Sequence, residues 1–205
     1  MKQFTAPCKK NINLLHRCFY FFKLKTDRMK KLNRKFKNLL KLILMHGPPG
    51  CGKGMQQDLL EKQIQKANKN FKVVTFDMGS RLREISKSID HPLSSEFKEF
   101  TDQGKSVPLD LICQVWMEFF ENLPEDTTHV ILAGTVRLVP EVNRFLEYVR
   151  EVSEAVIVFE LDVPEVECRR RIKNRFMQEN RSDDEKQDAV EQRFEVYKRG
   201  TISAL

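Results

Sequence analysis

The chain has 205 residues, 40% hydrophobic and 32% charged, which is enough to bury the core of one ordinary globular domain. Its formal net charge of +7 is unevenly spread: residues 1–41 hold thirteen Lys or Arg and one acid, Asp27, so the remainder carries −5. The five cysteines form no C-x-x-C pair and no metal-ligand spacing with the four histidines, which argues against a zinc-finger or disulfide-scaffold protein and favours a reducing, cytoplasmic setting.

Residues 1–40 form a basic extension that we expect to be disordered, ahead of a folded domain over residues 41–205. The apolar run of the extension, Cys18–Phe22, is too short for a membrane span or a signal peptide, so no stable membrane insertion is expected. A targeting segment, or a weak contact with an anionic partner such as nucleic acid or a membrane surface, would also account for its charge.

The first predicted strand, Leu42–Met45, leads into a glycine-rich loop that ends in a lysine. Its spacing fits G-x-x-x-x-G-K, in which backbone N–H groups turn toward phosphate oxygens and the lysine supplies a positive charge. A helix over Gln56–Ala67 would direct its N-terminal dipole at the same anion. The alternative is an ordinary glycine-rich turn. The candidate ATP-binding residues of this loop are Gly47, Pro49, Gly50, Cys51, Gly52, Lys53, Gly54 and Met55.

Further along the chain, short apolar runs alternate with stretches of helical periodicity. Strands are predicted at Lys72–Phe76, His129–Leu132 and Ala155–Leu161, and helices at Leu109–Asn122 and Glu141–Val152. This alternation indicates an α/β fold, with a parallel sheet covered by helices on both faces. Ligands bind such a sheet at the carboxyl ends of its strands, where the glycine-rich loop and the segments after the other strands would converge.

Five segments resemble, in order, the adenylate kinase family of nucleoside monophosphate kinases. The loop has the G-K-G form of that family, and DMGSRLRE is similar to its S-T-G-D-x-L-R. GKSVP is similar to G-x-x-V-P, and ILAGTVRLVPEV to L-D-G-F-P-R-T-x-x-Q. LDVPEVECRRRIKNRFMQENRSDD is similar to L-D-V-P, R-x-x-x-R, a short lid and R-x-D-D.

The resemblance implies a three-layer P-loop NTPase fold with strand order 2-3-1-4-5. The acceptor-binding part would cover about residues 77–108 and the short lid about residues 175–182. Family members continue beyond the segment that TISAL resembles, so the fifth strand is expected to be missing.

The resemblance also implies roles for individual residues in transfer of the γ-phosphate of ATP to a nucleoside monophosphate. The implied catalytic residues are Lys53, Arg175, Arg181 and Arg193, and Arg171 would pack on the donor adenine. The implied acceptor-binding residues are Met78, Gly79, Arg83, Val107, Gly134, Arg137 and Glu141. The partners would be ATP and the monophosphate, bound by a monomer. The alternative interpretation is that these arginines are solvated residues of a basic helix.

Three departures from the family pattern bear on the site: Met55 and Ala133 weaken the support for the Mg²⁺ ion that ATP would carry, and Ser80 bears on the acceptor. Met55 replaces a threonine, Ser80 an aspartate, and Ala133 an aspartate that helps hold water on the metal. The remaining candidate acids are Asp77, Asp183 and Asp184. Three hypotheses stay open: a working kinase, a catalytically impaired nucleotide-binding relative, and a P-loop protein whose basic tail binds nucleic acid. The acceptor base stays open as well, because Met78 and Glu141 differ from the adenylate pattern.

Overall fold

The computed structural model describes residues 35–36, 39–103, 106–150, 152–179, 184 and 186–201. Its centre is a parallel sheet of four strands in these residues, in the order β2-β3-β1-β4. The strands are β1 (Leu40–His46), β2 (Val73–Asp77), β3 (His129–Ala133) and β4 (Ser153–Glu160). All four predicted strands and the first four positions of the predicted strand order are confirmed.

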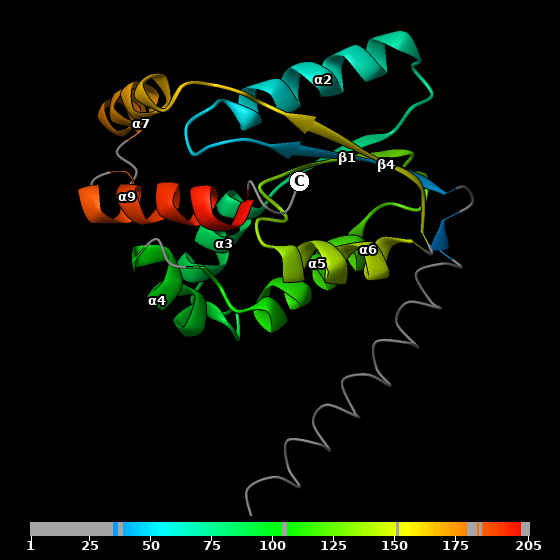
Figure 1. Cartoon of the computed structure of the whole chain (residues 1–205). Helices are drawn as coiled ribbons and strands as arrows, with labels where there is room; N and C mark the ends of the chain where they lie inside the picture. The colour runs from blue at the N-terminus through cyan, green and yellow to red at the C-terminus, as the bar shows by residue number, and fades with distance from the viewer. Residues whose placement is uncertain are drawn as a thin grey trace, which may run out of the picture.

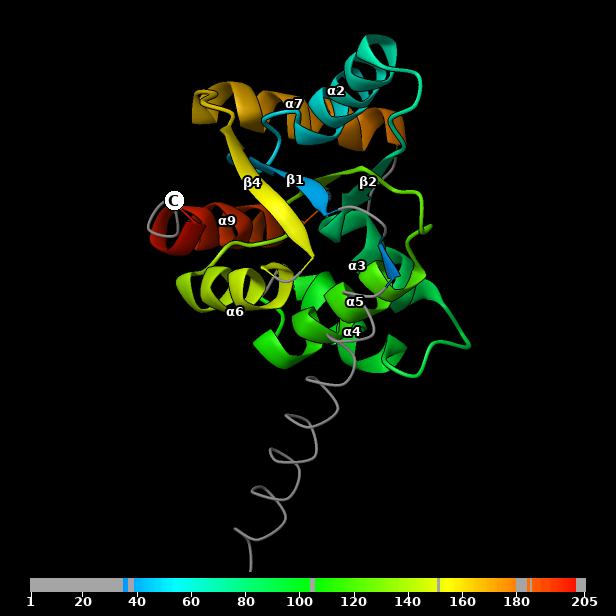
Figure 2. The same ribbon diagram turned by 90° about the vertical axis from the view of Figure 1, so that its right-hand side faces the viewer.

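Helices cover both faces of this sheet, as predicted (Figures 1 and 2). On one face lie α2 (Lys53–Ala67) and α7 (Glu165–Glu179). On the other lie α3 (Met78–Lys87), α4 (Ser94–Gln103), α5 (Leu109–Asn122), α6 (Val139–Val149) and α9 (Gln187–Val196). A π-helical turn, Tyr197–Thr201, continues α9. The predicted helices correspond to α2, α5 and α6, although α6 ends three residues earlier than expected.

The side chains of β1 alternate between two hydrophobic clusters, one on each face of the sheet. Leu42 and Leu44 face the large cluster formed with α3, α5 and α6, whereas Ile43 and Met45 face the small cluster under α2. Successive side chains of a strand point to opposite faces, so a strand covered on both faces must be apolar throughout. This requirement produces the uninterrupted run LILM in the sequence.

The strand β4 forms one edge of the described sheet. Its side chains Ile157, Val158 and Phe159 are each about half exposed, at 46%, 50% and 45%.

In the described part of the chain, no helix is both long enough and apolar enough to cross a membrane.

Folded structure is also present just before residue 41, where the domain was expected to begin. Leu40 is fully buried in β1, and Phe36 packs against the large core cluster. Lys35 donates a hydrogen bond to the carbonyl oxygen of Glu121 at the end of α5. The Leu40 and Phe36 side chains lie just outside the predicted strand, and the core that they join includes residues of α5 and α6, which come much later in the chain. Residues 1–34 and 202–205 lie outside the described residues.

The π-helical turn near the end of the described residues packs closely against the residues that precede α6. A Cβ atom on Gly200, in the π-helical turn, would lie 2.2 Å from Leu138 Cδ2 and 3.4 Å from the carbonyl oxygen of Arg137. A side chain at position 200 would therefore require Leu138 to adopt another rotamer.

Candidate active site

The glycine-rich loop between β1 and α2 is a tight turn packed against the segment that follows β4. Gly47, Gly50 and Gly52 adopt φ values of 138°, 80° and 100°, which side-chain-bearing residues rarely adopt. A Cβ on Gly50 would lie 2.6 Å from the carbonyl oxygen of Cys168 in α7. Glycine is therefore required at this position both by backbone conformation and by space.

Lys53 is the first residue of α2 and lies over this loop. Its Nζ donates to the carbonyl oxygens of Gly47 and Pro48 at 2.8 and 2.9 Å, and it lies 3.4 Å from the sulfur of Cys51. Burial lowers the pKa of Lys53, and the neighbouring thiol partly opposes that change. The ammonium group is thus held at the N-terminus of a helix, where the helix dipole also favours an anion.

Gln57, one turn further along α2, fixes this helix to the sheet. Its Nε2 donates to the carbonyl oxygens of Phe76 and Ile131 at 3.1 and 2.7 Å, and the side chain is buried. These bonds connect α2 to both β2 and β3. Gln57 therefore helps to set the position of Lys53, a role that the sequence analysis did not assign.

Two arginines lie across the cleft from Lys53, beyond the ends of β2 and β3. Arg83 in α3 donates from Nη2 to the hydroxyl of Ser80 at 2.9 Å and lies 3.9 Å from Asp77 Oδ1. Arg137 donates from Nε to the carbonyl oxygen of Gly134 at 3.3 Å. Gly134 has φ +60°, so the chain turns sharply at the end of β3 and directs the following residues back over the sheet edge.

On the opposite side, α7 and α9 each contribute an arginine to one shared carboxylate. Arg175 donates from Nε and Nη2 to the two oxygens of Asp184 at 2.7 and 3.0 Å, and Arg193 Nη2 lies 2.7 Å from Oδ1. The Asp184 side chain is fully buried. A buried carboxylate between two guanidinium groups stabilises both and fixes their orientation.

Arg171 in α7 is bound to the phosphate loop itself. Its Nη1 donates to the carbonyl oxygen of Cys51 at 3.0 Å, and its Nε donates to Glu167 at 2.7 Å. Hydrogen bonds from Arg170 and then Arg171 lower the pKa of Glu167 to about 2. Glu167 therefore stays ionised at neutral pH beside the loop.

These side chains line a single cleft of about 830 Å³ at the carboxyl ends of the strands. Of the residues expected to bind ATP or the acceptor, or to catalyse transfer, it is lined by Gly47, Pro49, Gly50, Cys51, Gly52, Lys53, Gly54, Met55, Gly79, Arg83, Val107, Gly134, Arg137, Arg171, Arg175 and Arg193. Cations from α2, α3, α7, α9 and the loop after β3 thus share one cavity.

Comparisons with known proteins agree with this geometry. The family model described as "Adenylate kinase" matches residues 45–205. The chain belongs to the adenylate kinase family. Adenylate kinase 1 of Schistosoma mansoni is 30% identical over 157 residues, which cover 77% of this chain and 74% of that protein. The adenylate kinase of Bacteroides fragilis is 29% identical over 76% of this chain and 77% of its own length. That of Leptospira biflexa is 27% identical over 81% and 84%.

Two of the residues that the adenylate kinase pattern places at the acceptor do not line the cleft. Met78 is 1% exposed and belongs to the large core cluster. The carboxylate of Glu141 accepts hydrogen bonds from the backbone N–H groups of Arg137 and Leu138 at 2.6 and 3.2 Å. Leu138, the N-cap residue of α6, has no side-chain acceptor, so Glu141 satisfies these donors.

Two other predicted residues, Arg181 and Asp183, lie outside the described residues. Asp184, a candidate metal ligand from the sequence, is instead bound by Arg175 and Arg193. This geometry favours a role in positioning the arginines. In the described residues, no three His, Cys, Asp or Glu side chains gather into a metal-binding group.

Several cleft residues were not assigned to the site from the sequence. His46, Arg170, Glu167 and Tyr197 all line the cleft. Glu167 precedes Arg170 by three positions and Arg171 by four, and this spacing on one helix face is a signal that the sequence does contain. His46 and Tyr197 carry no such local signal, because they lie far apart in the chain and meet only as lining residues of the folded cleft.

Asp77 is the acid best placed to compensate for the absence of an aspartate at position 133. In the register of β2 and β3, Asp77 pairs with Ala133, so the carboxylate lies one strand away from the position where the family pattern has its acid. Asp77 lines the cleft, and its charge acts on Lys53. Its Oδ1 accepts the backbone N–H of Ser80 at 2.6 Å, and the side chain remains 34% exposed. Carboxylate oxygen is the donor type that Mg²⁺ and its bound water prefer, so this residue fits the ion chemically.

Proposed function

We propose that this member of the adenylate kinase family transfers the γ-phosphoryl group of ATP to a nucleoside monophosphate. The observation that supports this proposal is the arrangement of cations in one cleft. Lys53 and Arg171 lie at the phosphate loop, Arg83 and Arg137 lie beyond β2 and β3, and Arg175 lies on α7. Two phosphate-bearing ligands that meet end to end require positive charge on both sides and at their junction.

In this mechanism the protein supplies no nucleophile. An oxygen of the acceptor phosphate attacks the γ-phosphorus, a new P–O bond forms, and the bond to the β–γ bridging oxygen breaks, which releases ADP and a nucleoside diphosphate. Lys53 would exchange its bonds to the carbonyl oxygens of Gly47 and Pro48 for bonds to the β- and γ-phosphate oxygens. Arg83 and Arg137 would hold the acceptor phosphate in line with the donor.

The arginine pair on α7 and α9 would stabilise the transferring group. Asp184 holds Arg175 and Arg193 together, so both guanidinium groups are oriented before ATP binds. Arg181 is proposed to join them from the lid. Closure over the phosphates would exclude water, which strengthens these interactions and prevents hydrolysis.

A Mg²⁺ ion carried by ATP would neutralise part of the phosphate charge. Asp77 would hold water on this ion in place of an acid at position 133, because Met55 offers only a weakly binding thioether. The Met55 side chain lines the cleft but is 69% exposed, so it leaves room there for the ion and its bound water. We further propose that the protein acts as a monomer in the cytoplasm.

The decisive experiment incubates the purified chain with Mg-ATP and, separately, AMP, CMP, UMP, GMP or dTMP, and detects diphosphate products by chromatography. Product from at least one acceptor is expected, and it should be absent with Lys53→Met. The variant should bind ATP more weakly but still fold, because Lys53 belongs to none of the hydrophobic core clusters. Product formation by Lys53→Met at the wild-type rate would contradict the assignment.

A second candidate function is nucleotide binding without transfer. It is favoured by Met55 and Ala133, which remove a hydroxyl and a carboxylate from the expected surroundings of the metal. In that case, ATP would bind to the wild-type chain, as measured by calorimetry, while no acceptor yields product.

A further inference from the structure

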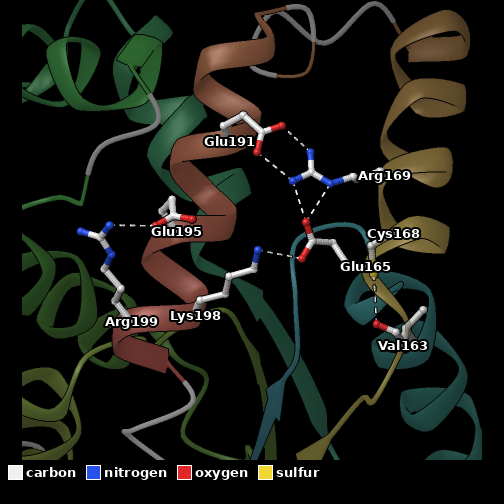
Figure 3. Close-up of polar contacts among 8 residues, drawn as sticks. All are labelled: Val163, Glu165, Cys168, Arg169, Glu191, Glu195, Lys198 and Arg199. Atoms are coloured by element: carbon white, nitrogen blue, oxygen red, sulfur yellow. Dashed lines mark hydrogen bonds and ion pairs between the residues drawn. The ribbon is translucent and has the colours of Figure 1, made fainter.

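A group of four charged side chains joins α7 to the C-terminal part of the chain outside the cleft. We call Glu165, Arg169, Glu191 and Lys198 the Arg169 network. Arg169 donates from Nε and Nη2 to Glu165 Oε1 at 2.9 and 2.6 Å, and its Nη1 and Nη2 donate to the two oxygens of Glu191 (Figure 3). Lys198 Nζ lies 2.9 Å from the other oxygen of Glu165. One guanidinium group therefore connects α7 with α9, and Glu165 extends the connection to the π-helical turn.

Arg169 also covers the apolar contact between the two helices. Its Cζ lies 4.4 Å from the centre of the Phe194 ring. Phe194 is 1% exposed and packs in a cluster with Cys168 of α7 and Cys51 of the phosphate loop. The guanidinium group thus lies over a small core that joins α7, α9 and the loop.

The network lies on the sides of α7 and α9 that face away from the cleft. Successive residues of a helix are rotated by about 100°, so residues two apart lie on nearly opposite sides. Arg171 follows Arg169 by two positions, and Arg193 follows Glu191 by two. Arg171 and Arg193 line the cleft, whereas Arg169 and Glu191 do not. Asp184 joins the two helices on the side of the arginines, and the Arg169 network joins them on the other side.

We propose that Arg169 is a positioning residue that holds α7 and α9 in register, so that Arg171, Arg175 and Arg193 meet the donor phosphates as one array. This inference rests on the proposed use of the cleft for ATP. Planar guanidinium binds carboxylates in a fixed geometry, which suits Arg for setting the relative position of two helices.

If Arg169 only stabilised the fold, its loss would have a different measurable effect. Arg169, Glu165 and Glu191 are 34%, 36% and 47% exposed, and ion pairs of this kind contribute little to folding. A shift of about 1 Å in a catalytic group, in contrast, can lower a rate by about 100-fold. Loss of Arg169 should therefore reduce turnover far more than it reduces stability.

The first experiment compares Arg169→Met with Arg199→Met under saturating ATP and acceptor. Arg199 pairs with Glu195 at 3.0 Å within the C-terminal helical segment and is 83% exposed, so it serves as a matched control that joins no two helices (Figure 3). We expect kcat to fall by at least about ten-fold in Arg169→Met, with little change in the KM of the acceptor and in the melting temperature. Arg199→Met should match the wild type. Equal losses in both variants, or a loss in Arg169→Met that follows unfolding, would overturn the proposal.

Arg169→Lys and Glu191→Gln test the geometry without a large change in packing. Lysine keeps the charge but lacks the planar group that binds two carboxylates, so an intermediate kcat is expected. Because Arg169 and Glu191 act as one unit, the double variant Arg169→Met/Glu191→Gln should be no slower than Arg169→Met alone. Independent, multiplying losses in kcat would contradict a shared role.

Equilibrium binding of ATP without acceptor separates this inference from the proposed reaction. By calorimetry, Arg169→Met should bind ATP several-fold more weakly than the wild type, and Arg199→Met should bind it equally well. If the wild type binds ATP but transfers phosphate to no acceptor, the proposed reaction is wrong, but the comparison of ATP affinities still tests the role of Arg169. In that case, an unchanged ATP affinity in Arg169→Met would refute the positioning role of Arg169.

Discussion

His46 is a buried histidine at the end of β1, in the same cleft as Lys53. Burial, and then the charge of Lys53, lowers the pKa of His46 from its ordinary value of 6.5. The folded state thus binds this proton more weakly than the unfolded state does. The stability that goes with a neutral His46 is therefore fully present above about pH 6.5. It is lost as the pH falls below that value toward the lower pKa of the folded state.

Acid should therefore destabilise the wild type more than His46→Leu. Urea unfolding of both proteins at pH 8 and pH 5.5 measures this difference. At pH 8 the histidine is neutral in both states, so any difference there reflects packing alone. Each pKa unit of displacement corresponds to about 1.4 kcal/mol. The explanation fails if the two proteins lose equal stability between the two pH values.

Gly50 and Gly54 test the packing of the phosphate loop at the scale of single atoms. Gly50→Ala would place a Cβ 2.6 Å from the backbone of Cys168 at a φ of +80°. We expect this variant to lose at least about 2 kcal/mol of unfolding free energy and to bind ATP poorly. A Cβ on Gly54 meets nothing within 4 Å, so Gly54→Ala should be neutral or more stable by about 0.5 kcal/mol. Thermal unfolding and ATP titration of the pair check this; similar behaviour of the two variants would refute it.

At the scale of elements, the start of α6 depends on a carboxylate. Removing the Glu141 side chain leaves the N–H groups of Arg137 and Leu138 without their acceptor, so Glu141→Ala should cost about 1 kcal/mol in urea unfolding. Burial raises the pKa of Glu141, against the opposing effect of those hydrogen bonds. Glu141→Gln keeps an acceptor without a buried charge and should be at least as stable as the wild type at pH 7.

The same pair of variants reports on recognition of the acceptor. If Glu141 only caps α6, Glu141→Gln should leave the order of preference among the five monophosphates unchanged. A change in that order would show that this side chain contacts the acceptor base.

Most elements could be predicted because their signals are local. The run LILM, the loop spacing to Lys53 and the periodicity of α2 and α5 each lie within one stretch of sequence. The role of Glu141 could not be read in this way, because it depends on Leu138 lacking a side-chain acceptor and on a fold that buries Glu141 beside it. The pairing of Asp184 with two arginines was also missed, since it depends on how α7 packs against α9. Likewise, only the register of β2 and β3 shows that Asp77 lies beside Ala133.

At the scale of the whole molecule, residues before β1 contribute to the core. A chain that begins at Lys35 retains the contacts of Lys35 and Phe36, whereas one that begins at Leu39 loses them. We expect the shorter chain to be less stable than the longer one by about 1–2 kcal/mol, because Phe36 is only partly buried. Urea unfolding of the two truncated proteins measures the difference. Equal stabilities would mean that these contacts contribute nothing.

The close approach of Gly200 to the Leu138 side chain joins the turn after α9 to the start of α6. Gly200 follows the helix that carries Arg193, and Leu138 follows Arg137 on the acceptor side. A side chain at position 200 would collide with a terminal methyl group of Leu138 and force that side chain into another rotamer. Sequence variation at position 200 should therefore be coupled to the residue at position 138, which lies next to Arg137.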